Sequence, residues 1–412
     1  MQADRKKILI LGGTVLQIPF IEKVKSMGHY VITCDNKPDN PGHKIADEYY
    51  NVSITDKDAV FYLAKKLNAD AVVNYSLEAG VQAAAYAQEK LGKPTSPYES
   101  VKILSNKKLF REFLKKHGFR TPGFITCHNK AEACTKISTL HFPVVVKPTD
   151  LWGSRGVTMV NTKNELDNAL EYAFANSRGA DIIIEEFVEA DGAPIEGNGF
   201  AVDGKLTTHA WADVYSDLKA DNPITPVCFC YPSDKPQSQL KKLDETLQRL
   251  LTLLDMKTNA YNIEARIDKQ GNIYLMEVAP RNGGNTSHDI LSFLTGKDIQ
   301  KAILLAALGE DCSFMDDTTC TKYWMGYVVH SNVEGIYKNL WIEAEFKKNN
   351  LQRYIPLIEE GSKVETYSGT NCTIGALLAS FNTREEMMTV VQDTSRKFRP
   401  SVWLRSCSHG CE

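Results

Sequence analysis

Short apolar runs alternate with amphipathic stretches along the first hundred residues. An unbroken apolar run between turn residues is typical of a buried strand, and apolar residues recurring every three or four positions are typical of a helix. Strands that alternate with helices predict an α/β fold with a parallel, doubly wound sheet. The predicted strands are 7–11, 30–34 and 71–74, and the predicted helices are 19–27, 58–67 and 80–90.

The pattern changes after the segment 93–97, which contains two prolines and which we interpret as a linker. Ser105 is a suitable N-cap for an amphipathic helix over 105–117, and Gly118 is a suitable residue to end it. The turn 268–271 predicts a hairpin of strands 261–267 and 273–278. Other predicted elements are strands 144–146 and 182–184, a helix 238–254, and, from about residue 313, a strand-rich unit ending in the helix 383–397.

Composition excludes several classes of protein. The chain has 24% charged residues, 43% hydrophobic residues and a net charge of -3, which is typical of a globular protein and gives no reason to expect nucleic-acid binding. No apolar run is long enough to predict a membrane span. Ten cysteines spread over 412 residues form no disulfide framework, so a reducing, cytoplasmic location is expected. We interpret Cys228 and Cys230 as core thiols, and the tail 407–411 as a disordered end rather than a metal site.

The start of the chain offers a dinucleotide-binding alternative. Gly12 and Gly13 follow the first predicted strand, and Asp35 closes the second, as in nicotinamide-binding proteins. The phosphate fingerprint G-x-G-x-x-G is incomplete, because Gln17 stands where the third glycine belongs. Nicotinamide chemistry therefore stays only an alternative.

A lysine, Lys147, follows the predicted strand 144–146. A buried ammonium group is costly without a partner, and a phosphate could be that partner. Alanine at this position is therefore expected to weaken phosphate binding and to leave the fold intact. In the next loop, residues 153–157 combine glycines with Ser154 and Arg155, and can present N–H groups and a guanidinium to anionic oxygens. A surface hairpin with an exposed basic tip is the alternative.

Two glutamates, Glu264 and Glu277, lie on the two strands of the predicted hairpin, each flanked by apolar residues. Carboxylates on adjacent strands repel each other unless a cation or a proton lies between them. Mg²⁺ held by one or two carboxylates and by nucleotide phosphates meets that demand, and solvent-facing glutamates are the alternative. Arg281, between a proline and two glycines, can clamp a phosphoryl group or a substrate carboxylate.

Taken in order, these motifs resemble those of the ATP-grasp superfamily, which includes D-alanine ligases, biotin carboxylase, glycinamide ribonucleotide synthetase and L-amino acid ligases. The resemblance covers nearly the whole chain. It implies an ATP-grasp fold preceded by a doubly wound parallel-sheet substrate domain and followed by a small C-terminal α+β domain. The implied domains are 1–98, 99–190 with the glycine-rich lid, 191–312 with the catalytic lobe, and 313–412.

The resemblance also implies a role for each matching residue. The nucleotide is bound by Lys107, Lys147, the loop residues Ser154, Gly156 and Val157, and the adenine hinge Glu186, Phe187 and Val188. The metal is held by Glu264 and Glu277, and the catalytic cations are Arg281, Lys147 and Arg155. Two positions depart from the pattern: the segment 190–196 is longer than usual, so that Glu196 is the best match to a ribose-binding acid, and Ala279 replaces a common asparagine metal ligand.

The implied reaction joins a carboxylate to an amine through an acyl phosphate, with release of ADP and phosphate. ATP and Mg²⁺ are the expected cofactors, with Mn²⁺ as an alternative metal. The expected partners are small-molecule carboxylate and amine substrates, amino acids first, with no nucleic acid or membrane, and a homodimer is left open. The alternatives are a purine-pathway ligase, a carboxylase like biotin carboxylase, a nicotinamide-dependent oxidoreductase, and a nucleotide-binding sensor without turnover.

Overall fold

The computed structural model describes residues 5–151, 153–177, 181–284, 290–316 and 322–403. The chain divides into two compact units, each built from three segments. Unit 1 is Met1–Thr121, Val188–Trp211 and Asp234–Cys320, and unit 2 is Pro122–Phe187, Ala212–Ser233 and Thr321–Glu412. The predicted domain boundaries at 98, 190 and 312 stay predictions. The tail 407–411 lies outside the described residues.

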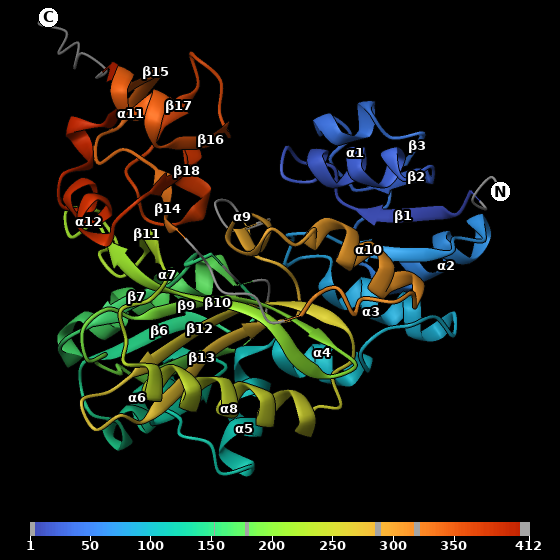
Figure 1. The fold of residues 1–412 in the computed structure, drawn as a ribbon. Coiled ribbons are helices and arrows are strands. Elements are labelled where there is room, and N and C mark those ends of the chain that lie inside the picture. Colours follow the sequence, from blue (N-terminus) through green and yellow to red (C-terminus); the bar gives the residue numbers. More distant parts are fainter. Residues whose placement is uncertain (1–4, 152, 178–180, 285–289, 317–321, 404–412) are drawn as a thin grey trace, which may run out of the picture. The chain divides into compact units, whose positions relative to one another are not determined.

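Unit 1 begins with a parallel sheet in the order β3-β2-β1-β4, flanked by helices (Figure 1). Successive residues of a strand point to opposite faces. Ile8 and Ile10 therefore join one core with Phe20, whereas Leu9 and Leu11 join a second core on the other face. The predicted α/β, doubly wound arrangement is confirmed. Its elements are β1 (Lys7–Leu11), α1 (Ile18–Ser26), β2 (Tyr30–Cys34), β3 (Glu48–Tyr50), α2 (Lys57–Leu67), β4 (Ala71–Asn74) and α3 (Val81–Lys90).

A second, antiparallel sheet in unit 1 contains β9 (Ile195–Val202), β12 (Asn259–Ile267) and β13 (Ile273–Ala279), with β12 in the middle. The helix α8 (Gln237–Leu253) packs its buried leucines against one face of this sheet (Figure 1). The predicted hairpin and the predicted long helix are confirmed. The unit also contains α4 (Tyr98–Leu104), α5 (Lys107–Lys116), α9 (Ile290–Thr295), α10 (Ile299–Leu308) and the first part of β10 (Lys205–Ser216).

The start of α5 differs from the prediction. Asn106, not Ser105, is the N-cap, because its side chain accepts a hydrogen bond from the backbone N–H of Leu109 at 3.1 Å. Ser105 instead is the C-cap of α4. This helix directly follows the linker 93–97 and was not predicted. The helix α5 therefore begins at Lys107, so that this lysine lies in its first turn.

Unit 2 contains an antiparallel sheet in the order β5-β8-β6-β7. Valines and isoleucines of the two central strands pack with the helix α7 to form its core. The elements are β5 (Phe124–Cys127), α6 (Lys130–Lys136), β6 (Val144–Pro148), β7 (Thr158–Val160), α7 (Leu166–Asn176) and β8 (Ile182–Glu186).

The rest of unit 2 is also rich in strands, as predicted, but among the described residues its last element is a strand and not a helix. The helix α12 stops at Gln392, and a further strand, β19, follows it because Phe398 is buried against Phe346 and the strand pairs with β15. The elements are the end of β10, β11 (Pro226–Tyr231), β14 (Tyr323–Val329), β15 (Gly335–Ile342), α11 (Ala344–Asn349), β16 (Leu351–Pro356), β17 (Lys363–Val364), β18 (Gly375–Phe381), α12 (Arg384–Gln392) and β19 (Phe398–Trp403).

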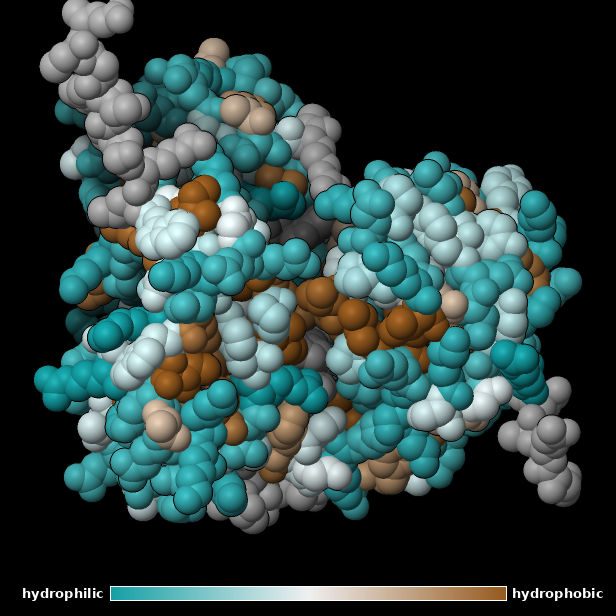
Figure 2. Space-filling model, turned by 90° about the horizontal axis from the view of Figure 1, so that it is seen from above, coloured by the Kyte–Doolittle hydropathy of each residue, from teal (hydrophilic) through white to brown (hydrophobic). Residues whose placement is uncertain are grey.

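Two predictions about composition can be compared with the structure. Cys228 and Cys230 are buried on β11 as free thiols with their Sγ atoms 3.8 Å apart, so the prediction of core cysteines is confirmed. Hydrophilic side chains dominate the face seen in Figure 2, and hydrophobic ones form limited groups on it. Within the described parts of the chain, every helix is too short or too polar to cross a bilayer.

Candidate active site

Three glutamates form a row across the second sheet of unit 1. Glu264 on β12 pairs in register with Glu277 on β13 and, on its other side, with Glu196 on β9. Ile263 and Ala265, the neighbours of Glu264, are buried in the core, so the row lies on the opposite face of the sheet. The tight hairpin thus brings the two predicted metal ligands together, and Glu196, the predicted ribose acid, lies in the same row.

Two cations of α5 reach the strand that carries Glu277. The Nζ atom of Lys107 lies 3.6 Å from Oε2 of Glu277. One turn later, the fully buried Arg111 donates to the backbone carbonyls of Leu275 at 3.0 Å and Met276 at 2.9 Å. Arg111 thereby fixes the backbone immediately before Glu277. The sequence analysis did not assign Arg111 a role, although its spacing of four residues from Lys107 places both on one face of the helix.

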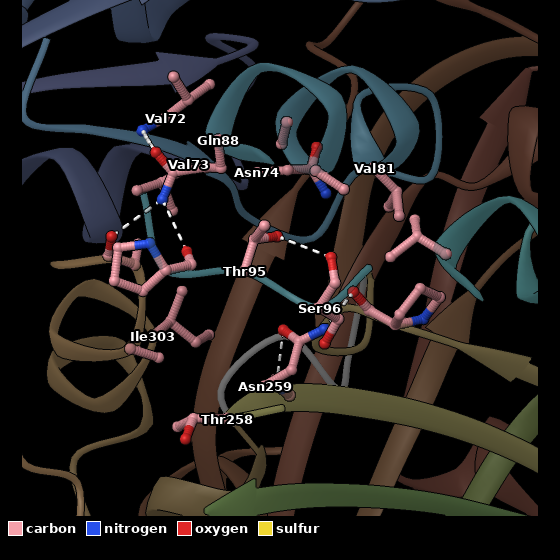
Figure 3. A pocket seen from close by; sticks show the side chains of 18 residues that line it. Val72, Val73, Asn74, Val81, Gln88, Thr95, Ser96, Thr258, Asn259 and Ile303 are labelled. Carbon is pink, nitrogen blue, oxygen red and sulfur yellow. Dashed lines mark hydrogen bonds between the residues drawn. The ribbon is translucent and has the colours of Figure 1, made fainter. Parts of the chain in front are cut away.

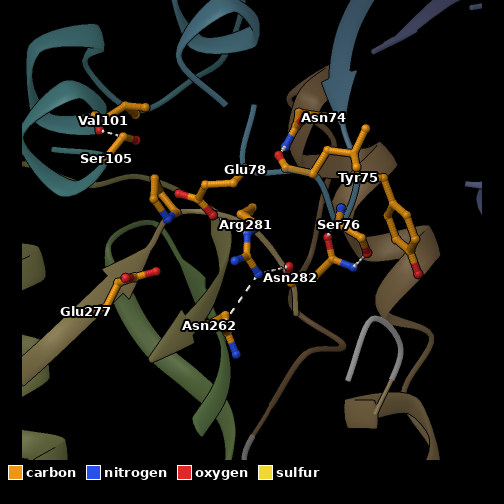
Figure 4. Close-up of polar contacts among 12 residues, drawn as sticks. Asn74, Tyr75, Ser76, Glu78, Val101, Ser105, Asn262, Glu277, Arg281 and Asn282 are labelled. Atoms are coloured by element: carbon orange, nitrogen blue, oxygen red, sulfur yellow. Dashed lines mark hydrogen bonds and ion pairs between the residues drawn. The ribbon is translucent and has the colours of Figure 1, made fainter. Parts of the chain in front are cut away.

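Arg281 lies beside Glu78, as Figure 4 shows, and its side chain is 11% exposed. Its Nε atom donates to Oε2 of Glu78 at 2.6 Å, and its Nη1 atom donates to the backbone carbonyl of Asn282 at 2.8 Å. Burial by itself would lower the pKa of Arg281, but Glu78, together with Glu277 and Glu196, raises that pKa above its ordinary value. The guanidinium is therefore held charged in a pocket of negative potential.

An asparagine, Asn262, lies opposite Ala279, which replaces the asparagine metal ligand that the resemblance implies. Asn262 on β12 pairs in register with Ala279, and its Nδ2 atom donates to Oε1 of Glu196 at 3.1 Å. The amide side chain of Asn262 thus lies on β12, opposite Ala279. The resemblance implies an asparagine at the position of Ala279. The predicted hairpin already brings these two positions near each other, and the strand pairing fixes their register.

In unit 2, Lys147 on β6 has a partner that the sequence analysis did not foresee. Its Nζ atom lies 2.5 Å from Oε2 of Glu185 on the adjacent strand β8, and this glutamate is only 1% exposed. Alanine at this position would remove the cation that pairs with this buried carboxylate, and the expectation that the fold survives the change stays a prediction. Lys147 can still face a phosphate, but it also neutralises Glu185.

The predicted adenine hinge crosses from unit 2 into unit 1. The carboxylate of Glu186 accepts hydrogen bonds from the backbone N–H groups of His141 at 2.9 Å and Gly123 at 3.3 Å. Although burial raises it, the pKa of Glu186 falls below its ordinary value because of these hydrogen bonds. The amide of Phe187 donates to Pro143, and in unit 1 the carbonyl of Val188 accepts from Arg266. These contacts fix the hinge backbone.

The glycine-rich loop of unit 2 contains three residues with left-handed backbone. Gly153, Ser154 and Gly156 have φ values of 67°, 59° and 70°. The carbonyl of Gly153 accepts a hydrogen bond from the backbone N–H of Thr370 at 3.2 Å, and the carbonyl of Val157 accepts one from the side chain of Asn222. A Cβ atom on Gly153 would lie 2.2 Å from Oγ1 of Thr370, so only glycine fits this position.

The carboxylate oxygens of the row can supply some, but not all, of the ligands that a hard cation such as Mg²⁺ needs. The carboxylate row offers oxygen ligands of the kind that Mg²⁺ prefers. Within the described residues, however, no three Asp, Glu, His or Cys side chains are close enough to hold a metal by themselves. Two carboxylates therefore fit a magnesium ion whose remaining ligands are phosphate oxygens and water.

A separate cavity of about 90 Å³ lies in unit 1 (Figure 3). Its lining is mainly apolar, from Val72, Val73 and Val81 of the first sheet and helix α3, with Asn74 and Pro280 at its edge. None of the predicted site residues lines it. We therefore take the carboxylate row with Arg281, and not this cavity, as the candidate active site of unit 1.

Comparison with known proteins identifies the middle of the chain. A family profile described as an ATP-grasp domain matches residues 140–289. This part of the chain is an ATP-grasp domain. The match includes Lys147, the loop, the hinge, the carboxylate row and Arg281, so the family suggested by the motifs is confirmed.

About half of the chain is also similar in sequence to a curated protein. The chain is 31% identical over 190 residues to a formate-dependent phosphoribosylglycinamide formyltransferase of Bacteroides thetaiotaomicron, a match that covers 45% of this chain and 49% of the relative. The chain thus spans about half the length of that curated relative.

Solved structures share the fold over nearly the whole chain. An L-amino acid ligase from Bacillus licheniformis superposes with a TM-score of 0.80 and 18% identity, covering 97% of this chain and 100% of the other. A biotin carboxylase domain of the 2-oxoglutarate carboxylase from Hydrogenobacter thermophilus, in complex with MgADP, has a TM-score of 0.74 and 18% identity over 96% of this chain and 91% of the other. The ATP-grasp fold with its preceding sheet domain is confirmed.

Proposed function

We propose that the protein is an ATP-dependent carboxylate–amine ligase that acts through an acyl phosphate on an amino acid or a similar small metabolite. The observation that carries the proposal is the row of Glu264, Glu277 and Glu196 with Arg281 buried beside it. Carboxylates and a guanidinium on neighbouring strands can neutralise and align a transferring phosphoryl group. The match of residues 140–289 to an ATP-grasp domain supports ATP as the phosphoryl donor.

The proposed reaction has two steps. A carboxylate oxygen of the substrate attacks the γ-phosphorus of ATP, and the bond to the β–γ bridging oxygen breaks, so that ADP leaves. The nitrogen of the amine then attacks the acyl carbon, the bond to the phosphate oxygen breaks, and the amine loses a proton to water. The products are an amide, ADP and phosphate.

Each predicted site residue has a role in this reaction. Lys107 and Lys147 bind ATP phosphates, and the loop with Ser154, Arg155, Gly156 and Val157 covers them. Glu186, Phe187 and Val188 hold the adenine, with Glu196 as the candidate for the ribose.

Glu264 and Glu277 hold Mg²⁺, with Mn²⁺ as a possible substitute, and this ion supplies neutralisation of phosphate charge when bound. Arg281 steadies the phosphoryl group as negative charge shifts toward its oxygens.

A phosphate-release screen tests the proposal. The protein is incubated with Mg-ATP and pairs of amino acids, and the nucleotide product is separated by chromatography. We expect ADP and phosphate in amounts that match the amide formed. AMP and pyrophosphate would contradict the acyl-phosphate route, and reduction of NADP⁺ or NAD⁺ without ATP consumption would favour the dinucleotide alternative.

A purine-type ligase is the second candidate, because the curated relative acts on phosphoribosylglycinamide with formate by its name. Such a substrate carries a phosphate monoester, which needs cations beyond those that serve ATP. In the proposed scheme, Lys107 and Arg281 of unit 1 already serve the ATP phosphates and the transferred phosphoryl group, which favours the amino-acid candidate. Phosphate release with phosphoribosylglycinamide and formate, but not with amino acids, would reverse this preference. Bicarbonate-dependent release would favour a carboxylase.

A further inference from the structure

A short segment of unit 2, residues 366–372, lies against the glycine-rich loop, and we call it the platform segment. Its central residue, Thr370, is 217 positions away from Gly153 along the chain. The backbone N–H of Thr370 donates to the carbonyl oxygen of Gly153 at 3.2 Å, and Oγ1 of Thr370 donates to the same oxygen at 3.3 Å. Two donors thus fix the orientation of one peptide group of the loop.

Two glycines allow the two backbones to come this close. A Cβ atom on Gly153 would lie 2.2 Å from Oγ1 of Thr370, and a Cβ atom on Gly369 would lie 3.1 Å from the carbonyl oxygen of Gly153. Gly369 has a φ of 177°, an extended conformation that any residue adopts, so only the lack of space favours glycine there. The platform segment and the loop therefore pack backbone against backbone.

The platform segment is anchored in unit 2 independently of the loop. Tyr367 is fully buried, its backbone N–H donates to the carbonyl of Ser331 at 3.0 Å, and its hydroxyl donates to the carbonyl of Pro226 at 3.0 Å. The carbonyl of Ser368 accepts a hydrogen bond from the side chain of Asn222 at 3.4 Å. These contacts fix the position from which Thr370 reaches the loop.

The contact with Thr370 leaves the N–H groups of the loop available. In a planar trans peptide, the C=O group and the following N–H group point in opposite directions. Because the carbonyl of Gly153 points toward Thr370, the N–H of Ser154 points away from the platform segment. Within the described part of the chain, the N–H groups of Ser154, Arg155 and Gly156 donate no hydrogen bond. Successive N–H groups in such a turn form a concavity that binds anions.

The conformation of Ser154 needs support from its surroundings. Its φ of 59° lies in the left-handed region, which a residue with a Cβ rarely adopts. Backbone of this kind persists only where neighbouring groups hold it in place. The hydrogen bonds from Thr370 to the preceding carbonyl supply this support, and none of the predicted site residues belongs to the platform segment.

We propose that the platform segment orients the glycine-rich loop so that the N–H of Ser154 faces a phosphate oxygen of the nucleotide, with Thr370 as the positioning residue. This inference rests on the proposed ATP-dependent function, and it adds a part of the chain that acts on the nucleotide only through the loop. Loss of the contact should therefore weaken the binding of the phosphates and leave the binding of the adenosine part unchanged.

The variant Thr370→Pro tests this positioning role. Proline has no N–H, and its ring occupies the place of the hydrogen that Thr370 donates to Gly153. The backbone otherwise accepts proline, because Thr370 is exposed, begins a 3₁₀ helix and follows the extended Gly369. Calorimetry measures the affinity of both proteins for a non-hydrolysable ATP analogue with Mg²⁺ and for adenosine. We expect the affinity for the analogue to fall by about tenfold and that for adenosine to change by less than about twofold.

Two results would overturn the positioning role. The first is an unchanged affinity of Thr370→Pro for the analogue, and the second is an equal loss of affinity for the analogue and for adenosine, which would show a general effect on the structure. A wild-type protein that binds no ATP analogue would instead count against the proposed function itself.

The matched control is Lys163→Pro. Lys163 is exposed, begins another 3₁₀ helix of unit 2 and follows the extended residue Thr162. Because the first N–H groups of a helix have no partner within it, proline should be accepted there, and both affinities should equal those of the wild type. Thermal unfolding of each protein shows whether it is folded.

A second variant decides the question if Thr370→Pro does not fold. Gly369→Ala keeps the N–H of Thr370 but places a Cβ 3.1 Å from the carbonyl oxygen of Gly153, so the loop must move by a few tenths of an ångström. We expect the affinity for the ATP analogue to fall by about threefold, with the affinity for adenosine unchanged. Wild-type affinity of Gly369→Ala for the analogue would then overturn the positioning role.

Discussion

The predicted site residues fall into two halves, one in each unit, that handle charge in opposite ways. In unit 1, three glutamates stand on three paired strands whose register fixes their spacing. In unit 2, the buried lysine has a buried acid as its partner, and the neighbouring residues form a loop of left-handed backbone. A rigid row of like charges suits the binding of a cation, because no rearrangement is needed to bring the ligands together. A loop suits a group that must cover a ligand and release it.

The two halves also differ in what stabilises them. The carboxylate row is anchored indirectly, through Arg111 and the backbone carbonyls before Glu277. The loop is anchored by hydrogen bonds to Thr370 and Asn222, which come from distant parts of unit 2. Substitutions in the row should therefore lower the rate of phosphate release with little change of stability. Substitutions in unit 2 should also change the stability and the position of the loop.

The largest effect is expected at Glu277. Glu277→Gln keeps the shape but removes a charge from the row, and should lower the rate of phosphate release by on the order of a hundredfold or more. The measurement is steady-state phosphate release across a Mg²⁺ titration. The matched comparison is Ala279→Asn, which should change the rate far less because Asn262 already projects on the strand opposite. Near-wild-type turnover of Glu277→Gln at every Mg²⁺ concentration would remove Glu277 from the metal site.

The next effect is expected at Lys147, and it should appear in both binding and stability. Lys147→Ala removes a phosphate partner and the cation that forms an ion pair with the buried Glu185, so the free energy of unfolding should fall by about 3–5 kcal/mol. The affinity for ATP should fall by about tenfold or more, since a charged hydrogen bond is lost. Urea unfolding and calorimetric titration with ATP measure the two quantities.

The double variant Lys147→Ala with Glu185→Ala separates the two roles of the lysine. Removing both members of the ion pair also removes the buried carboxylate, so the double variant should recover much of the lost stability but none of the lost affinity. Full affinity of either protein for ATP would mean that Lys147 serves only the fold.

A smaller effect is expected in the glycine-rich loop. Gly153→Ala introduces a Cβ that would lie 2.2 Å from Oγ1 of Thr370, and it also strains a residue with a φ of 67°. Strain of this kind is on the order of 1 kcal/mol or more, so phosphate release should fall by about fivefold. Trypsin cleavage after Arg155 should become faster in Gly153→Ala than in the wild type.

The same cleavage assay tests whether the loop is a lid. A non-hydrolysable ATP analogue should slow cleavage after Arg155 in the wild type, because a lid over the phosphates is less accessible. Gly118→Ala offers a control, since Gly118 also has a left-handed φ, of 69°, but a Cβ there would meet no atom within 4 Å. Equal cleavage rates with and without the nucleotide would contradict a lid.

The smallest effect is expected in the pH dependence of stability. The pKa of Glu186 is lower in the folded protein than its ordinary value of about 4.3, so its contribution to stability is present above that pH and is lost as the pH falls through the lower, folded value. The urea midpoint of wild type should therefore exceed that of Glu186→Gln near neutral pH, and the difference should shrink in acid. A difference that grows in acid would show that the hydrogen bonds to His141 and Gly123 do not favour the ionised carboxylate.

Local sequence signals predicted the elements well where one turn or one apolar run was sufficient. The turn 268–271 fixed the hairpin, and with it the pairing of Glu264 and Glu277, because a tight turn leaves little freedom in register. The strand β19 was missed, since its partner β15 lies about sixty residues earlier and its own run contains Pro400. The cap at Asn106 was assigned one residue too early because serine and asparagine are both good caps.

By itself, the sequence of this protein determined the α/β class, the ATP-grasp motifs and the identity of the charged residues that carry them. Only the tertiary structure decided which charges are paired. Glu185 with Lys147 and Glu78 with Arg281 come from segments that are distant along the chain. The physical reason is that periodicity reports which face of an element is buried, whereas the partner of a buried charge depends on strand register and on the packing of other elements against that face.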